Sequence, residues 1–237
     1  MVLRILIKQL LSDLMKSLIN LLKKVPIDLG QGAVAEYTEG KQIAKRLTPD
    51  GAGRTALDLG ARHGAQTQWL KEKGYLVTSV DVDPKFVGCD ELDANEPLPY
   101  DDESFDLVWC SEVIEHLQVP AFSLSELLRV TRAGGRLILT TPNSYMWLFV
   151  VLAWFGLSPK RLQRDDHLHF FDLDSFRQLH PEADLYGYFP YAGWKVTIRR
   201  DWMLKWLTPT FVMCIERPIL VANNDAETEE DTHATSV

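Results

Sequence analysis

The sequence predicts an α/β protein whose mostly parallel sheet is covered by helices on both faces. Short apolar runs typical of buried strands alternate with helical segments, the order expected of parallel strands joined by crossover helices. One stretch, Thr55 to Gly64, reads as a strand, a glycine-containing turn and the start of a helix. The 237 residues are 46% hydrophobic and 24% charged, which suits a globular protein with a substantial core.

The remaining elements follow from apolar periodicity and turn residues. A helix from Ala35 to Leu47 leads into a turn cluster, Thr48 to Gly53, and Gly134-Gly135 marks a later turn. Further strands are expected at Tyr75–Val80, Phe86–Cys89, Phe105–Cys110, Arg136–Thr141 and Thr210–Glu216, and helices at Gln66–Lys73, Ala121–Thr131 and Asp172–His180. We therefore divide the chain into a lead-in at 1–50, a ligand-binding domain at 51–220 with a substrate or lid region at about 144–190, and a disordered acidic tail at 221–237.

Two segments have surfaces that suit a membrane or a partner. Residues 1–24 predict an amphipathic helix whose polar side is basic, and Pro26 ends it. Residues 145–157 are the most apolar stretch, but they are shorter than the ~20 residues that span a bilayer. Each segment has two interpretations: packing on the protein's own core, or contact with a lipid surface or an apolar substrate.

Charge and cysteine content exclude some classes of protein. The net charge of −8 argues against tight nonspecific binding of nucleic acid. The three cysteines are far apart in the sequence, which disfavours a disulfide framework or a cysteine-based zinc site. We find no convincing secretory signal. We therefore expect a cytoplasmic protein, and peripheral contact with a membrane is compatible with that location. The sequence indicates no oligomeric state.

The stretch from Thr55 to Gly64 has the features of a nucleoside-binding turn. Gly60 and Gly64 allow a backbone to approach a ligand closely at the end of a parallel strand. Asp81 follows 21 positions after Gly60, where an acid can accept hydrogen bonds from both ribose hydroxyls. Asp93, further on, can accept from the exocyclic amine of an adenine.

Four blocks together resemble the class I S-adenosylmethionine-dependent methyltransferases: LDLGARHG, VTSVDVDP, LDANEPLPYDDESFDLVWCSEVIEHL and LLRVTRAGGRLILTTPN. The resemblance covers roughly residues 35–176. It implies a Rossmann-like fold with a seven-stranded sheet and S-adenosylmethionine as cofactor. The residues that it implies for cofactor binding are Asp58, Gly60, Ala61, Gly64, Asp81, Val82, Asp93, Ala94 and Ser111. One departure is Arg62, where the family usually has glycine, and an inward-pointing side chain there would crowd the cofactor.

The block SEVIEH contains the candidate chemical groups. Glu112, Glu115 and His116 are spaced i, i+3 and i+4, so on a helix they would share one face and form half of a metal site. A second cluster, Asp165 to His169, can supply a further ligand, His167. The same block resembles that of ubiquinone-biosynthesis O-methyltransferases, which implies Mg²⁺, and that of small-RNA 2′-O-methyltransferases. The metal-free alternative makes His116 or His167 the general base, and a purely structural role stays open.

Three functions remain in competition. The first is methyl transfer to an oxygen of a small or lipid-like acceptor, which the acidic charge and the apolar segment favour. The second is RNA 2′-O-methylation, which needs a basic track; its candidates are Arg161, Arg164, Arg199, Arg200, Lys205 and Arg217. The third is a non-catalytic cofactor-binding scaffold, for which Arg62 is the main argument. The acceptor region, 146–187, matches no branch of the family closely.

Overall fold

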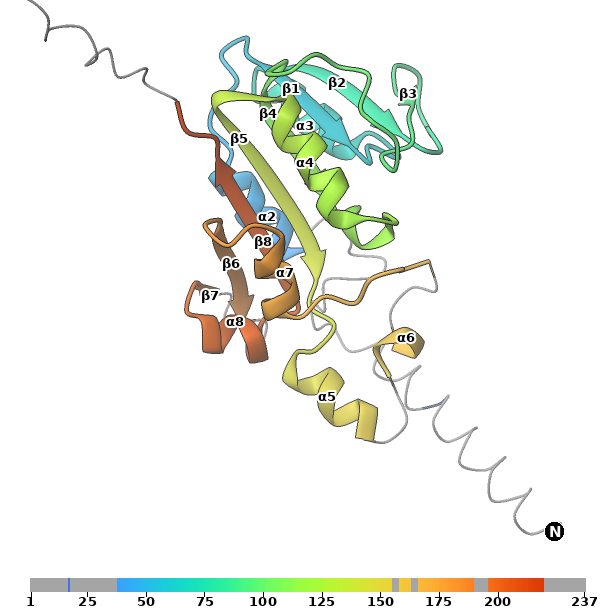
Figure 1. Ribbon diagram of the computed structural model, residues 1–237, viewed down its shortest axis with the longest axis vertical. Coiled ribbons are helices and arrows are strands. Elements are labelled where there is room, and N and C mark those ends of the chain that lie inside the picture. The colour runs from blue at the N-terminus through green and yellow to red at the C-terminus, as the bar shows by residue number, and fades with distance from the viewer. Residues whose placement is uncertain (1–16, 18–37, 155–157, 163–165, 190–195, 220–237) are drawn as a thin grey trace, which may run out of the picture.

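The computed structural model describes Ser17 and residues 38–154, 158–162, 166–189 and 196–219. The helix predicted for residues 1–24 and the tail predicted for 221–237 lie outside the described residues. The described chain forms one sheet with the strand order β3-β2-β1-β4-β5-β8-β6-β7 (Figure 1). None of its helices is long and apolar enough to cross a membrane.

The predicted mostly parallel sheet is confirmed. Strands β3, β2, β1, β4 and β5 are parallel neighbours, whereas β8 is antiparallel to both β5 and β6, and β7 is antiparallel to β6. The described sheet has eight strands, whereas the resemblance implied seven. Strands β6 and β7, which pair as a hairpin, were not expected from the sequence pattern. The strands are β1 Thr55–Leu59, β2 Leu76–Asp81, β3 Asp90–Glu91, β4 Phe105–Ser111, β5 Thr131–Pro142, β6 Asp184–Phe189, β7 Val196–Ile198 and β8 Thr210–Glu216.

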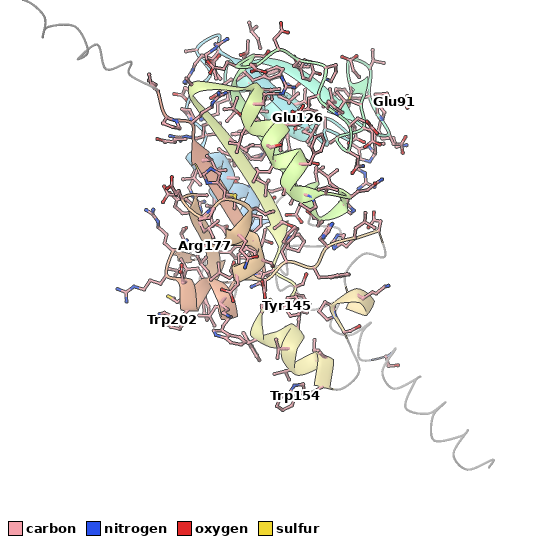
Figure 2. All side chains as sticks on the ribbon, in the orientation of Figure 1. Glu91, Glu126, Tyr145, Trp154, Arg177 and Trp202 are labelled. Carbon is pink, nitrogen blue, oxygen red and sulfur yellow. The ribbon has the colours of Figure 1, made fainter. Side chains whose placement is uncertain are left out.

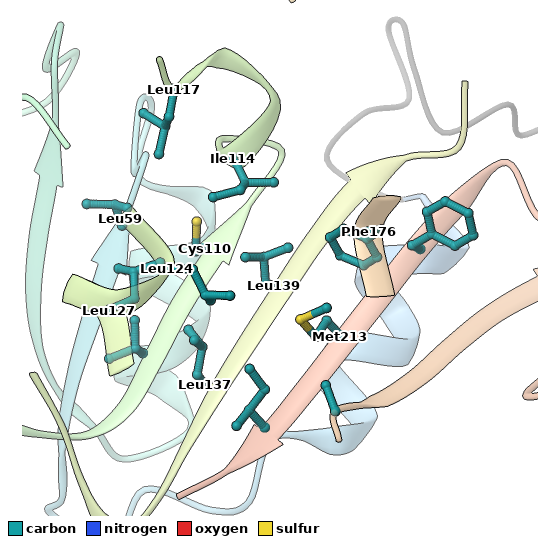
Figure 3. Packing of buried hydrophobic residues seen from close by; sticks show 14 of the residues in the cluster. Leu59, Cys110, Ile114, Leu117, Leu124, Leu127, Leu137, Leu139, Phe176 and Met213 are labelled. Atoms are coloured by element: carbon teal, nitrogen blue, oxygen red, sulfur yellow. The ribbon is translucent and has the colours of Figure 1, made fainter. Parts of the chain in front are cut away.

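Helices cover both faces of the sheet, as predicted, because alternate side chains of each central strand point to opposite faces. Leu107 and Trp109 of β4 belong to a core with α2 and α3, and Val108 and Cys110 belong to another core with α4, α7 and α8. Figure 2 shows Glu126 of α4 and Arg177 of α7 on the second face, and Figure 3 shows its packed core. The helices are α2 Glu39–Leu47, α3 Ala65–Glu72, α4 Pro120–Val130, α5 Trp147–Trp154, α6 Pro159–Leu162, α7 Leu173–Leu179 and α8 Asp201–Leu207, with a 3₁₀ turn η2 at Ile114–His116.

Two predicted boundaries are wrong. Gly134 and Gly135 do not end an element: β5 starts at Thr131 and runs through them, and its pairing with β4 shifts register between Phe105 and Leu107. The positive φ of Gly134, 76°, accommodates this irregularity within the strand. The short strand β3 lies at Asp90–Glu91 rather than at 86–89. The last strand, β8, has the predicted bounds.

The strand order places a switch point at β1. From β1 the chain builds outward through β2 to β3, and it then returns to form β4 on the other side of β1. The loops that follow β1 and β4 therefore diverge at the carboxyl edge of the sheet. Open parallel sheets bind their ligands at this point.

Candidate functional site

The turn after β1 lies against the loop after β4. The backbone amides of Gly60 and Ala61 both donate to the carbonyl of Val80, at 2.9 and 3.1 Å, which ties the turn to β2. Gly60 has a φ of 79°, and a Cβ on it would lie 2.2 Å from Cγ2 of Val113. Glycine is therefore required both for the backbone conformation and for the close approach of the two loops. Gly64, with a φ of 81°, begins α3.

Arg62 occupies the middle of this turn in a left-handed conformation, with a φ of 44°. This region costs a non-glycine residue roughly 1–2 kcal/mol, which explains why the position suits glycine. The Arg62 side chain is exposed to solvent rather than buried in the turn. The scaffold hypothesis, for which Arg62 is the main argument, is therefore left to a measurement of cofactor binding.

Asp81, the last residue of β2, has a carboxylate oriented by two backbone amides. Oδ2 accepts from the amide of Arg62 at 2.9 Å, and Oδ1 accepts from the amide of Asp83 at 2.8 Å. A carboxylate has about four acceptor positions, so one remains on each oxygen. Two vicinal hydroxyls can use that pair, and the arrangement therefore fits a ribose. Val82, the next residue, is exposed.

The loop after β3 is fastened to the segment that leads into α4. Oδ1 of Asp93 accepts from the amide and the side chain of Asn95, at 2.9 and 2.8 Å, in an Asx turn. Oδ1 of Asn95 in turn accepts from the amide of Gln118 at 2.7 Å, and Ser123 donates to the carbonyl of Ala94 at 3.0 Å. These contacts hold Asp93 and Ala94 beside the loop that follows β4. The sequence argument missed Asn95 and Gln118, because their pairing spans 23 residues.

Asp58 is part of the interior. It is 1% exposed, and its Oδ2 accepts a hydrogen bond from Thr67 Oγ1 at 2.6 Å, which fastens β1 to α3. Burial raises its pKa from 3.8 to about 6, although the hydrogen bond from Thr67 opposes the shift. With so little exposed surface, Asp58 stabilises the turn rather than touching a ligand, unlike the contact that the resemblance implied.

Ser111 and Glu112 continue into a hydrogen-bonded chain at the end of β4. Thr140 Oγ1 donates to Oε1 of Glu112 at 2.9 Å, so Ser111 Oγ, 2.8 Å away, donates to Thr140. Glu112 has a φ of 57° and follows the last residue of β4. The prediction that Glu112, Glu115 and His116 share a helix face is wrong, because only Ile114–His116 form a 3₁₀ turn.

Three side chains converge next to this strand end: Glu115, His116 and His167. One ligand atom from each lies within 4.8 Å of the other two. The imidazole rings of His116 and His167 meet edge to face, with centroids 4.8 Å apart. The amides of Leu168 and His169 both donate to the carbonyl of Glu115 at 3.0 Å, which holds the His167 loop in place. The structure thus brings together residues about fifty positions apart, as the sequence argument allowed.

Glu115 is a buried acid with spare acceptor capacity. Its Oε2 accepts from Thr141 Oγ1 at 3.0 Å, while Oε1 is buried without a hydrogen-bond partner among the described residues. Burial, and then the nearby Glu112, raise the pKa of Glu115 well above 4.5. A buried carboxyl oxygen of this kind calls for a proton or a cation. Thr141 was missed from the sequence, because it lies on β5.

Asp166 fixes the tautomer of His116. Nδ1 of His116 lies 2.9 Å from the backbone carbonyl of Asp166, and a carbonyl can only accept, so Nδ1 carries the proton. The lone pair of the neutral ring is therefore on Nε2. The Asp166 carboxylate lies 3.8 Å from the same Nδ1, where it would stabilise a positively charged ring. His116 is thus prepared either to accept a proton or to bind a metal through Nε2.

The donor set decides which metals this cluster suits. Two imidazoles and one carboxylate are typical ligands of divalent transition metals such as Zn²⁺, Mn²⁺ or Fe²⁺. Mg²⁺ prefers oxygen ligands, and Glu112 is not in the cluster. The predicted Mg²⁺ site of Glu112, Glu115 and His116 therefore finds no support, and a transition-metal site of Glu115, His116 and His167 takes its place as the metal hypothesis.

The basic track needed for RNA binding is weakened by ion pairs. Three of its six candidate residues are paired: Arg199 with Asp184 at 2.8 Å, Lys205 with Asp174 at 2.7 Å, and Arg217 with Glu103 at 3.0 Å. Each pair lowers the local positive charge available to phosphates. The described surface thus gives little support to the RNA alternative.

Comparison with known proteins bears on the same part of the chain. Residues 57–139, from β1 to β5, match the family described as "Methyltransferase domain". This match supports the predicted class I S-adenosylmethionine-dependent methyltransferase family. The matched region of this methyltransferase contains the turn of Gly60, the Asp81 carboxylate and the SEVIEH block.

Curated relatives of this methyltransferase are O-methyltransferases by name. The "Ubiquinone biosynthesis O-methyltransferase" of Aromatoleum aromaticum is 28% identical over 117 residues, which are 43% of this chain and 50% of the relative. The "Malonyl-[acyl-carrier protein] O-methyltransferase" of Erwinia billingiae is 30% identical over 124 residues, 48% of this chain and 49% of the relative. The chain therefore spans about half the length of the curated relatives that it matches.

Solved structures share the fold over a larger part of the chain. An S-adenosylmethionine-dependent methyltransferase from Mesorhizobium loti has a TM-score of 0.57 at 13% identity, covering 74% of this chain and 96% of its own. Another from Archaeoglobus fulgidus has a TM-score of 0.54 at 15% identity, covering 76% and 94%. At such identities the likeness confirms the Rossmann-like methyltransferase fold.

Proposed function

We propose that this methyltransferase transfers a methyl group from S-adenosylmethionine to an oxygen atom of a small or lipid-like acceptor. The observation that carries the proposal is the fixed tautomer of His116, which leaves the lone pair on Nε2, in a residue that clusters with Glu115 and His167. An oxygen nucleophile needs such a group, because its proton must leave as the methyl group arrives. The names of the two relatives, both O-methyltransferases, support oxygen as the acceptor atom.

The cofactor brings the methyl group and its own leaving group, so the protein has mainly to hold and orient it. In the proposed arrangement Asp81 accepts from the ribose hydroxyls. The turn from Gly60 to Gly64 lies along the methionine end, with Ala61 between them. Asp93 and Ala94 hold the adenine. Ser111, at the end of β4, closes the site on the side of the acceptor.

The acceptor proton is proposed to pass to Nε2 of His116. The ring then carries a positive charge, which the Asp166 carboxylate, 3.8 Å from Nδ1, stabilises. His167 lies edge to face with His116 and helps to hold the acceptor oxygen. A metal ion is the second candidate for this role, because Oε1 of Glu115 is buried with an open acceptor position. A metal would bind the same Nε2 and lower the acceptor's affinity for its proton.

An activity assay with two variants tests the proposal. Purified protein is incubated with S-adenosylmethionine and a set of phenolic, catecholic and carboxylic probes, and released S-adenosylhomocysteine is measured. His116→Ala should lower kcat by about 10²–10⁴-fold without loss of cofactor binding. His180→Gln, at the carboxyl end of α7, is the matched control and should keep full activity.

Chelator distinguishes the two candidate mechanisms. Activity that persists in EDTA supports His116 as general base, whereas loss that Mn²⁺ or Zn²⁺ restores supports the metal. Full activity of His116→Ala would contradict both. Cofactor binding by the parent protein without turnover of any probe would favour the non-catalytic scaffold, and turnover of an RNA 3′ end alone would favour the RNA alternative.

A further inference from the structure

Helix α5 presents an apolar surface that the rest of the described protein leaves open. Its eight residues, Trp147–Trp154, include no charged residue and no Ser, Thr, Asn or Gln, yet Phe149 alone is buried. Trp154 is 87% exposed, and Figure 2 shows it at the outer end of the helix, pointing away from the body of the protein. Trp147, Val151 and the preceding Tyr145 are exposed as well. Such a surface usually marks an interaction site.

The segment that leads into α5 is hydrogen-bonded to the segment that follows His167. Helix α5 begins five residues after Pro142, the end of β5, so it starts at the carboxyl edge of the sheet. The amide of Ser144 donates to the carbonyl of Phe171 at 3.0 Å, which ties the start of α5 to the loop of His167. In that loop Leu168, next to His167, is 58% exposed.

The sequence from residue 145 to 164 is basic, and Asp165 and Asp166 follow it. Residues 145–164 contain three basic residues and no acid, in a chain whose net charge is −8. Lys160, in the short helix α6, is exposed. Residues 1–24 add five basic residues and one acid, and their sequence is that of an amphipathic helix.

The amino-terminal segment joins the described structure at the same end of the sheet. Thr38 caps α2, and a Cβ on Gly40 would lie 2.9 Å from Thr210 Cγ2. Thr210 pairs with Pro142, shortly before α5. Both basic, apolar segments therefore attach near one edge of the molecule.

We propose that α5 docks the protein on an anionic lipid membrane, with its axis in the plane of the interface. Eight helical residues measure about 12 Å, far short of the ~30 Å hydrocarbon core, so α5 can lie in the interface but cannot span it. Tryptophans at both ends suit the headgroup level, and neighbouring Lys and Arg residues suit acidic headgroups. A second copy of the chain fits less well, because the basic flanks would repel each other and a stable interface needs about 800 Å² per partner. The inference goes beyond methyl transfer and does not depend on it.

Vesicle flotation tests the inference without cofactor or acceptor. The full chain is mixed with phosphatidylcholine vesicles, with or without phosphatidylglycerol, and the bound fraction is measured at low and high salt. Binding is expected to vesicles that contain phosphatidylglycerol and to weaken with salt. Trp154→Glu and Val151→Glu should each weaken it by roughly tenfold or more, because each places a charge on the docking face. Leu76→Glu is the matched control and should bind normally, because Leu76 is an exposed apolar residue at the amino end of β2, at the opposite edge of the sheet.

Four outcomes would overturn the inference. The first is that the parent protein does not bind the vesicles, and the second is that Trp154→Glu and Val151→Glu bind as the parent does. The third is that Leu76→Glu loses as much binding as those two variants. The fourth is that light scattering finds a dimer that Trp154→Glu separates, which would show that a second copy of the chain covers α5. A fourth variant, Leu10→Glu, assigns the contribution of the amino-terminal segment. If it abolishes binding while Trp154→Glu has no effect, that segment rather than α5 is the contact.

Discussion

Replacing Asp58 with asparagine should change how the stability of the protein depends on pH. The pKa of Asp58 is raised from 3.8 to about 6, chiefly by burial. Between these two values the folded protein holds a proton that the unfolded chain has released, so the free energy of unfolding falls as the pH rises through this window. At about 1.4 kcal/mol for each pH unit, the loss amounts to about 3 kcal/mol by about pH 7.

The side chain introduced by Asp58→Asn does not titrate, so the variant escapes this loss. Its oxygen can keep the hydrogen bond from Thr67, whereas its buried NH₂ group costs about 1–3 kcal/mol at every pH if it finds no acceptor. The quantity to follow is therefore the difference in unfolding free energy, variant minus parent. It should rise by about 3 kcal/mol between about pH 4 and about pH 7, whatever its starting value. Glu115 titrates in both proteins, so its effect cancels in the difference.

Urea unfolding followed by circular dichroism across this pH range measures the difference. Asp106→Asn is a control of opposite sign, because hydrogen bonds from Thr55 and Arg132 outweigh burial and lower the pKa of Asp106. Its difference should fall as the pH rises through the ordinary range of an aspartate. A difference for Asp58→Asn that stayed constant, or that fell with pH, would refute the assignment of Asp58 as a buried, destabilised carboxylate.

Three further substitutions test the cofactor turn. Asp81→Ala should weaken binding of S-adenosylhomocysteine by at least tenfold in calorimetry, because each ribose hydroxyl left unpaired costs about 1–3 kcal/mol; undiminished affinity would show that the ribose lies elsewhere. Arg62→Gly should raise the unfolding free energy by up to about 1 kcal/mol, because it relieves a left-handed residue with a φ of 44°; a lower melting temperature would contradict this account. Gly60→Ala should lower the unfolding free energy by roughly 1–3 kcal/mol through its contact with Val113, and wild-type urea stability would contradict the packing.

The amino-terminal half of the sheet could be predicted because its signals are local. Short apolar runs bounded by turn residues define β1, β2 and β4, and the glycines of the first turn are needed for its backbone angles. The hairpin of β6 and β7 was missed because β6 reads DLYGYF, without clean alternation. Gly187 in that strand is required by tertiary packing: a Cβ there would lie 2.5 Å from Thr208 Oγ1.

The cluster of Glu115, His116 and His167 could be predicted only in part. The spacing of Glu112, Glu115 and His116 puts them on one face only if a helix follows β4. The chain instead turns at Glu112, whose side chain accepts a hydrogen bond from Thr140 on β5. The contact between Glu112 and Thr140 is tertiary, and no local sequence pattern predicts it. Likewise, the tautomer of His116 depends on a backbone carbonyl fifty residues away, which any residue type could provide. Sequence spacing can propose such groups, but it cannot orient them.

Isothermal titration of S-adenosylhomocysteine into the parent protein tests the central claim most directly. The claim is that the turn at Gly60 and the carboxylate of Asp81 form a working cofactor site, with Arg62 outside it. Saturable binding of one molecule per chain, unchanged by added magnesium, is the predicted result. An absence of binding would contradict this claim. S-adenosylhomocysteine differs from S-adenosylmethionine only by the transferred methyl group, so a site that cannot bind it is not a working cofactor site.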